Sequence, residues 1–257
     1  RAKSSPELTP QNKNPIISQY TGEWVAPGCN WIITGPDLKS LWNVYHARKG
    51  GGHARRLCLD PLRIDSKTGD LVCDGPTWEP RPNPAPPTWC EDFAREDFSL
   101  NWKPVSGQWK SGGGVLKCEA TGDNKTGRMH CKCPMGKDFV AEFNVKLIDK
   151  PAAGQSYGIS MCGSDSESLY VVVDAASKSF QLRESGSSKP IKQAVLPEPF
   201  TLDVWHTIVV EKRGNHLTAY FDGMRKIDAE IEAEGTAFGF VTTNCRADFS
   251  WCGFSNL

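Results

Sequence analysis

The sequence lacks the two features that would place it in a membrane or on a nucleic acid. No apolar run approaches the length of about eighteen residues that a membrane-spanning helix needs, so we predict no membrane partner. The 30 basic and 30 acidic side chains cancel, and no basic stripe is interleaved with aromatic residues. This removes the usual electrostatic attraction to nucleic acid or to anionic lipid.

The usual metal and redox motifs are also missing. The five His residues are scattered, without the i, i+4 spacing of a zinc site, and the ten cysteines include no Cys-x-x-Cys pair. The run that contains Asp165 and Glu167 has the oxygen ligands that Ca²⁺ prefers, but it also has the composition of an ordinary polar turn. We therefore predict no cofactor and assign no metal site.

Helical periodicity is absent as well, and short β-rich runs alternate with turn residues throughout the chain. Residues 143–147 alternate apolar and polar side chains, which predicts a strand with one buried face. The turn Arg213-Gly214-Asn215-His216 separates two such runs and predicts a hairpin. We expect an all-β fold in which residues 93–257 form a two-sheet antiparallel sandwich, with a core that includes Phe143, Val145, Leu147, Ile208, Val210, Tyr220 and Phe240.

A proline-rich segment divides the chain. Five prolines fall within eight residues, from Pro80 to Pro87, and favour an extended, semi-rigid conformation. We predict that residues 81–92 are a linker. Before it, runs at 30–34, 41–47, 56–64 and 70–73 predict one four-stranded antiparallel sheet within residues 1–80. Such a sheet is the unit that β-propellers repeat.

Four pieces of this first part occur in the order known from a hydrolase family. They are Ala26 to Asn30, Tyr45-His46-Ala47, Arg55 to Leu62, and Asp74-Gly75-Pro76-Thr77. Together they resemble the last blade of the five-bladed propeller of glycoside hydrolase family 43, although Cys29 stands where that family often has His. The resemblance implies that Arg55, Asn30 and Trp31 bind substrate.

The same resemblance implies inverting hydrolysis by three acidic residues. In the family these residues come from earlier blades, so we predict no catalytic residue in this chain. We expect the chain to be a processed or truncated piece, the C-terminal portion of a secreted glycoside hydrolase. The implied substrates are plant or microbial polysaccharides or oligosaccharides with arabinose- or xylose-type glycosides. The expected partners are carbohydrate and an N-terminal propeller polypeptide.

The second part resembles a concanavalin A-like, laminin-G-like jelly roll. The resemblance covers residues 93–257 and rests on Glu96 to Trp102, Gly107-Gln108-Trp109, Asp138 to Phe143, Trp205 to Val210, and Gly214 to Gly223. Because this sandwich serves many functions, two alternatives stay open. One is a carbohydrate-binding lectin or accessory module without catalysis, and the other is a laminin-G-like adhesive domain. The run Glu230, Glu232 and Glu234 could place carboxylates on one face, but we interpret it as a solvated acidic face.

One loop suggests an oxidising compartment. Cys118 and Cys131 flank Thr121 to Gly127 symmetrically, and a hairpin centred there would bring the two cysteines opposite one another for a disulfide. Asn124 lies in the sequon Asn-Lys-Thr at the loop tip, where a glycan could be attached. Both features predict a secreted, extracellular protein. Buried free thiols and a chance sequon in a cytosolic protein are the alternative.

Overall fold

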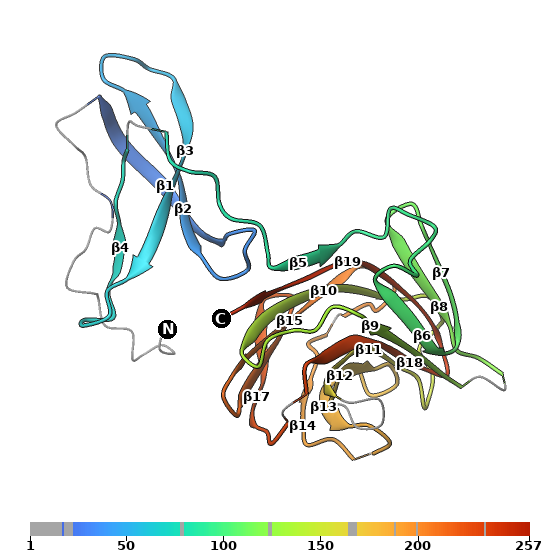
Figure 1. Cartoon of the computed structure of the whole chain (residues 1–257). Helices are drawn as coiled ribbons and strands as arrows, with labels where there is room; N and C mark the ends of the chain where they lie inside the picture. Colours follow the sequence, from blue (N-terminus) through green and yellow to red (C-terminus); the bar gives the residue numbers. More distant parts are fainter. Residues whose placement is uncertain are drawn as a thin grey trace. The chain divides into compact units, whose positions relative to one another are not determined.

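The computed structural model divides the chain into two compact units, Arg1–Pro86 and Pro87–Leu257 (Figure 1). It describes residues 17, 23–77, 80–122, 125–163, 169–187, 189–198, 200–233 and 235–257, without the side chain of Cys162. The described strands pair in antiparallel fashion, and the chain is all-β as predicted. The described residues contain no helix that could cross a membrane.

The described part of the first unit forms one four-stranded sheet in the order β1-β2-β3-β4, as predicted. β1 starts at Trp24, earlier than the predicted run, and its register with β2 shifts between Val25 and Trp31. Pro27 lies within that irregular stretch, where a residue without an N–H cannot complete a regular ladder. The strands are β1 (Trp24–Thr34), β2 (Leu41–Lys49), β3 (Arg55–Ile64) and β4 (Leu71–Cys73).

The two faces of this sheet differ in burial. One face buries Tyr45 and Ala47 against Ile17, with Cys58 and Cys73 packed beside them. On the other face Trp31 is 70% and Leu57 81% exposed. The first face is therefore covered by the chain's own flanking segment, and the second has a large exposed apolar area.

A buried carboxylate, that of Asp60, joins three segments of the first unit. Asp60 is 1% exposed and accepts a hydrogen bond from the Tyr45 hydroxyl at 2.5 Å. The Thr77 hydroxyl donates to its other oxygen at 2.5 Å, and the Arg81 Nε lies 4.0 Å from that same oxygen. Asp60 on β3 therefore attaches β2 and the start of the proline-rich segment to one point.

Counted over its described residues, the second unit is a sandwich of an eight-stranded and a seven-stranded sheet. The first sheet has the order β17-β16-β15-β10-β19-β8-β7, with β5 also paired to β19, and the second has the order β14-β13-β12-β11-β18-β9-β6. The strands of the eight-stranded sheet are β5 (Trp89–Glu91), β7 (Gln108–Gly112), β8 (Val115–Glu119), β10 (Phe139–Leu147), β15 (His206–Arg213), β16 (His216–Phe221), β17 (Met224–Glu230) and β19 (Arg246–Asn256). Those of the seven-stranded sheet are β6 (Trp102–Ser106), β9 (Thr126–Cys131), β11 (Ser156–Gly163), β12 (Leu169–Asp174), β13 (Ser179–Glu184), β14 (Lys192–Val195) and β18 (Ala237–Thr243).

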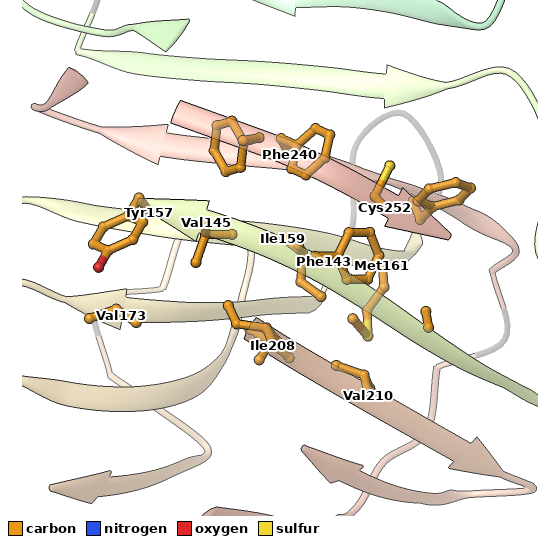
Figure 2. Packing of buried hydrophobic residues seen from close by; sticks show 14 of the residues in the cluster. Phe143, Val145, Tyr157, Ile159, Met161, Val173, Ile208, Val210, Phe240 and Cys252 are labelled. Carbon is orange, nitrogen blue, oxygen red and sulfur yellow. The ribbon is translucent and has the colours of Figure 1, made fainter. Parts of the chain in front are cut away.

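The core lies between these two sheets. Figure 2 shows side chains of both sheets meeting there, among them Phe143 of β10 and Phe240 of β18. Six of the seven predicted core residues are buried in it, and Tyr220 is the exception. Tyr220 points outward because Ala219 and Phe221, its neighbours on β16, take the inward positions.

The sandwich begins before residue 93, where we expected its start. β5 pairs with β19 through Trp89 and Phe254, so the last residues of the expected linker, 81–92, are already part of the sheet. Trp89 stacks on Phe254 at a centroid distance of 5.9 Å and contacts Trp102 edge to face at 5.7 Å. Trp89 is apolar and follows the prolines directly, so β5 closes the end of the core.

The position of β5 makes the boundary testable. We expect the fragment 87–257 to unfold cooperatively and to exceed the fragment 93–257 in stability by roughly 2 to 3 kcal/mol, less than the effect of removing a fully buried Trp, because Trp89 is only partly buried. The fragment 1–86 should not unfold cooperatively, because its open apolar face has no cover. Urea denaturation followed by Trp fluorescence measures all three, and equal stability of the two longer fragments would contradict the role given to β5.

A second prediction concerns Asp60. Asp60→Asn replaces a carboxylate that accepts two hydroxyl hydrogen bonds, so local opening of residues 23–77 should become easier by about 1 to 3 kcal/mol. The matched control is Asp74→Asn, since Asp74 forms an exposed ion pair with Arg63 at 3.6 Å and should cost about 0 to 1 kcal/mol. Amide hydrogen exchange in the full chain gives both values, and equal effects would show that the Asp60 contacts are unimportant.

Candidate functional site

The predicted substrate-binding residues of the first unit lie on β1 and β3. Arg55 begins β3, and its Nη1 donates a hydrogen bond to Nε2 of His46 at 2.7 Å. The register of the strands places Arg55 and Trp31 on the same open face, but no contact joins them. Asn30 is exposed within the irregular stretch of β1.

His46 was not among the predicted site residues, although it is the direct partner of Arg55. Because Arg55 donates to Nε2, that nitrogen accepts and the neutral ring carries its proton on Nδ1. His46 also passes close to Gly28, where a Cβ would lie 3.3 Å from Nε2. The sequence signal was available, since His46 and Gly28 are both in the pieces that resemble family 43.

The second unit has a more developed site on the outer face of its seven-stranded sheet. Residues 157, 159 and 161 of β11 point into the core, so Ser156, Gly158 and Ser160 point outward. The same alternation holds on the neighbouring strands. We call the outward residues the polar face; they are Arg128, His130, Ser156, Gly158, Ser160, Tyr170, Val172, Asp174, Ser179, Gln181, Arg183, Gly239, Val241 and Thr243.

The polar face is buried to an unusual degree for the outside of a sheet. Ser156, Ser160 and Ser179 are each 3% exposed, and Gln181 and His130 are 7% and 8% exposed. Tyr170, Val172 and Val241 form a small apolar cluster of their own, separate from the main core. Polar side chains withdrawn from water beside an apolar patch are typical of a ligand site.

Hydrogen bonds order the side chains of the polar face. Arg183 on β13 reaches across β12, and its Nη2 donates to the Ser156 hydroxyl on β11 at 2.6 Å. The hydroxyl of Tyr170 pairs with that of Ser185 at 2.9 Å. Gln181 donates to the Ser179 hydroxyl at 2.8 Å. The polar groups are therefore held in place before any ligand arrives.

Glycine residues allow the strands to approach closely in the middle of the polar face. Gly239 on β18 lies directly opposite His130 on β9, and a Cβ on Gly239 would collide with the Met129 carbonyl oxygen. Only glycine permits that approach of the two strands. Gly158 lies opposite Val241 in the next strand pair. At positions 158 and 239 the central strands therefore present backbone in place of a side chain.

Two carboxylates of the eight-stranded sheet have raised pKa values, but they lie too far apart along their strands for glycoside hydrolysis. Burial raises the pKa values of Glu142 and Asp248, which lie on the outer face of the eight-stranded sheet. Asp248 pairs with Lys146, four residues along β10 from Glu142, so their backbones are roughly 13 Å apart along the strand. An inverting pair needs carboxyl groups about 6.5 to 9.5 Å apart.

The acidic run begins with Glu230, the last residue of β17. Glu230 and Glu232 are exposed, and His216 lies between Glu230 and Asp228, with one ring nitrogen 2.9 Å from a carboxylate oxygen of each. Ile231 between Glu230 and Glu232 is buried, so these two carboxylates face solvent as we interpreted from the sequence. Glu234, Asp165, Glu167 and the predicted glycosylation site Asn124 lie outside the described residues.

The predicted disulfide between Cys118 and Cys131 is not formed, and both are free thiols. The hairpin on which it rested does not exist, because Cys118 lies on β8 in the eight-stranded sheet and Cys131 on β9 in the other. The loop between them crosses from one sheet to the other. Cys118 instead lies 3.1 Å from the Thr242 hydroxyl, and burial raises the pKa of each of the two thiols to about 12.

The polar face was missed by the sequence reasoning because its members come from five strands. One signal was present: Ser156, Gly158 and Ser160 alternate with the large core residues of β11. A row of very small residues on an outward face indicates that something lies above it. The contact of Arg183 with Ser156 depends on the order of the strands in the sheet, which the sequence does not show.

Comparison with solved structures supports the fold of both units. No protein-family model and no curated protein sequence matches the chain. A carbohydrate-binding module, CBM66 from Bacillus subtilis, matches 61% of this chain and 96% of its own length, with 17% identity and a TM-score of 0.52. The β-glucanase of Bacillus licheniformis matches 66% of this chain and 98% of its own, with 13% identity and a TM-score of 0.52.

A third structure matches almost the whole chain. The GH43 protein BlXynB from Bacillus licheniformis covers 97% of this chain with 17% identity and a TM-score of 0.52. This chain spans only 57% of that protein. At these identities the matches establish the fold alone: an all-β chain whose second unit is a jelly-roll sandwich.

The thiols provide a direct test of the sandwich. Iodoacetamide at neutral pH should label the exposed Cys29 and Cys90 in the native chain, and leave Cys118, Cys131, Cys245 and Cys252 unmodified. Burial both shields these four thiols and raises their pKa values, so little thiolate is present to react. Peptide mass spectrometry before and after denaturation gives the labelling. A Cys118–Cys131 linked peptide in non-reduced protein would contradict the finding that both thiols are free.

Proposed function

We propose that this chain is the carbohydrate-binding, C-terminal portion of a secreted glycoside hydrolase similar to family 43. In this proposal the polar face of the sandwich binds the glycan, and the chain itself performs no hydrolysis. The observation that carries the proposal is the burial of polar side chains on that face, where Ser156, Ser160 and Gln181 are withdrawn from solvent. Sugars need closely spaced hydrogen-bond partners next to an apolar surface. Tyr170, which is 7% exposed, is the aromatic residue of this face, and it packs on the buried Val172 and Val241.

We assign glycan binding and glycoside hydrolysis to different polypeptides because of where the carboxylates lie. On the polar face the only acidic residue in the described ranges is Asp174, whose Oδ1 accepts hydrogen bonds from the backbone and side chain of Ser177. A face without two facing carboxyl groups can hold a sugar but lacks the general acid and base of glycoside hydrolysis. The catalytic carboxylates are therefore assigned to an N-terminal propeller polypeptide.

The first unit supports the same proposal through its open face. Trp31, Leu57 and Leu59 are 70%, 81% and 42% exposed on one side of a four-stranded sheet. A propeller blade packs both faces against neighbouring blades, and an apolar face of this kind suits that cover. Arg55, held by His46 on this face, is then positioned to bind a sugar hydroxyl, with Trp31 and Asn30 as weaker contacts. The arabinose- or xylose-type substrate rests on the family resemblance, and the secreted location rests on the predicted glycosylation site Asn124.

Glycan binding by the full chain tests the proposal. The folded chain should bind at least one polysaccharide in a panel of arabinan, xylan, fructan, β-glucan and acidic polymers. Tyr170→Ala should weaken binding at least tenfold, because it removes the aromatic surface of the polar face. Affinity electrophoresis measures both.

The matched control is Tyr220→Ala. Tyr220 lies on the outer face of the other sheet and should leave binding unchanged. Thermal melting checks that both variants fold. No binding to any member of the panel, or equal loss in the two variants, would refute the assignment of the polar face.

A further inference from the structure

Among its described residues, the polar face carries more positive than negative charge, although the whole chain is neutral. It contributes Arg128 and Arg183, and Lys103 of β6 lies opposite His130 at its edge. Asp174 is the one carboxylate on the face within the described ranges, and the Ser177 hydroxyl and N–H already occupy its Oδ1. Because the chain has 30 basic and 30 acidic side chains, this excess is local to the face.

Arg183 is the central cation. Its guanidinium is half-buried and crosses β12 to donate to Ser156, which is a neutral hydroxyl. A guanidinium has five N–H donors, and in the described residues Arg183 forms no ion pair. Burial lowers its pKa, while Asp174 and Tyr170 act in the opposite direction. A charge withdrawn from water gains most from an anionic partner.

Short side chains and glycine lie beside the residue that Arg183 contacts. Ser156 lies opposite Thr243 on β18, and Gly158 lies opposite Val241, so small residues flank the end of the Arg183 side chain. On the far side of β18, Arg128 pairs in register with Val241 and donates to His130 Nε2 at 3.4 Å. Two guanidinium-bearing residues thus stand on either side of β18, with apolar and hydroxyl groups between them.

We propose that the glycan bound on the polar face is an acidic one, whose carboxylate or sulfate group binds to Arg183 beside Ser156. This inference rests on the function proposed above. A planar guanidinium matches two oxygens of a carboxylate or a sulfate in one geometry, which Lys cannot reproduce. A neutral sugar would leave Arg183 without an ion-pair partner in the described residues.

Chemically matched polymers test the inference on the full chain. Polygalacturonate, glucuronoxylan and alginate are each compared with their carboxyl-reduced neutral forms, and dextran sulfate is compared with dextran. The expected result is binding to at least one acidic polymer that falls at least tenfold in its neutral counterpart and weakens with added salt. The two series distinguish a carboxylate ligand from a sulfate ligand.

Variants at Arg183 distinguish specific binding of an anionic group from nonspecific electrostatic attraction. Arg183→Gln should weaken acidic-polymer binding at least tenfold, and Arg183→Lys should lie between it and the native chain. Arg213→Gln removes an exposed Arg of the other sheet, paired with Glu211, and should leave binding unchanged. Thermal melting verifies folding. If Arg183→Gln does not fold, Arg183→Lys, which keeps the charge, provides the comparison with the native chain.

Each of the other outcomes overturns either the acidic-glycan inference or the proposed function. Equal binding of acidic and reduced polymers would overturn the acidic-glycan inference and leave the proposed function intact. Acidic-polymer binding that Arg183→Gln and Arg213→Gln weaken equally would also overturn it, because the attraction would then be diffuse. Failure of the folded chain to bind any polymer, acidic or neutral, would overturn the proposed function itself.

Discussion

The aromatic layer between the two sheets of the sandwich is the interaction on which the rest of the second unit depends. Phe240 packs on Phe249 of the opposite sheet at 4.3 Å and on Trp102 at 5.2 Å between ring centroids. Phe143 meets Phe240 edge to face at 5.9 Å. Rings of this size bury large apolar areas and prefer offset or edge contacts, so they fix the spacing of the sheets. Each inward ring also sets its two neighbours on the strand outward.

That constraint explains why the polar face can be specialised. Alternate residues of β11, β12, β13 and β18 point into the core, and the remaining residues lie outside the main core. Small residues and hydroxyl groups are found there, and Arg183 extends over them. The first unit divides its positions differently: one face buries the Tyr45–Asp60 hydrogen bond, and the other leaves Trp31 and Leu57 open. The residues that stabilise the core and the residues of the proposed binding face therefore lie on opposite sides of the same strands.

Alternation could be read from the sequence, and it predicted the all-β fold, the four strands of the first unit and most of the core. Tyr220 was misplaced because it stands between Ala219 and Phe221, and three adjacent apolar or aromatic residues give no contrast between the inward and outward positions. What alternation cannot show is which sheet a strand joins. Cys118 and Cys131 flank a symmetric loop, yet that loop crosses the sandwich. Arg55 was found through a motif, whereas Arg183 and Ser156 meet only because β12 lies between their strands.

Gly239 has a consequence for how this protein would change over evolutionary time. Since any side chain at this position would meet the Met129 carbonyl, substitutions here would be removed whatever the chain binds. Arg183, in contrast, is free to vary with the ligand, because no backbone contact depends on it. Descendants of one ancestor should therefore share the glycine and differ at the arginine. A family tree drawn from the central strands would then record common origin, while the outward residues beside them would record changes in the ligand proposed for the polar face.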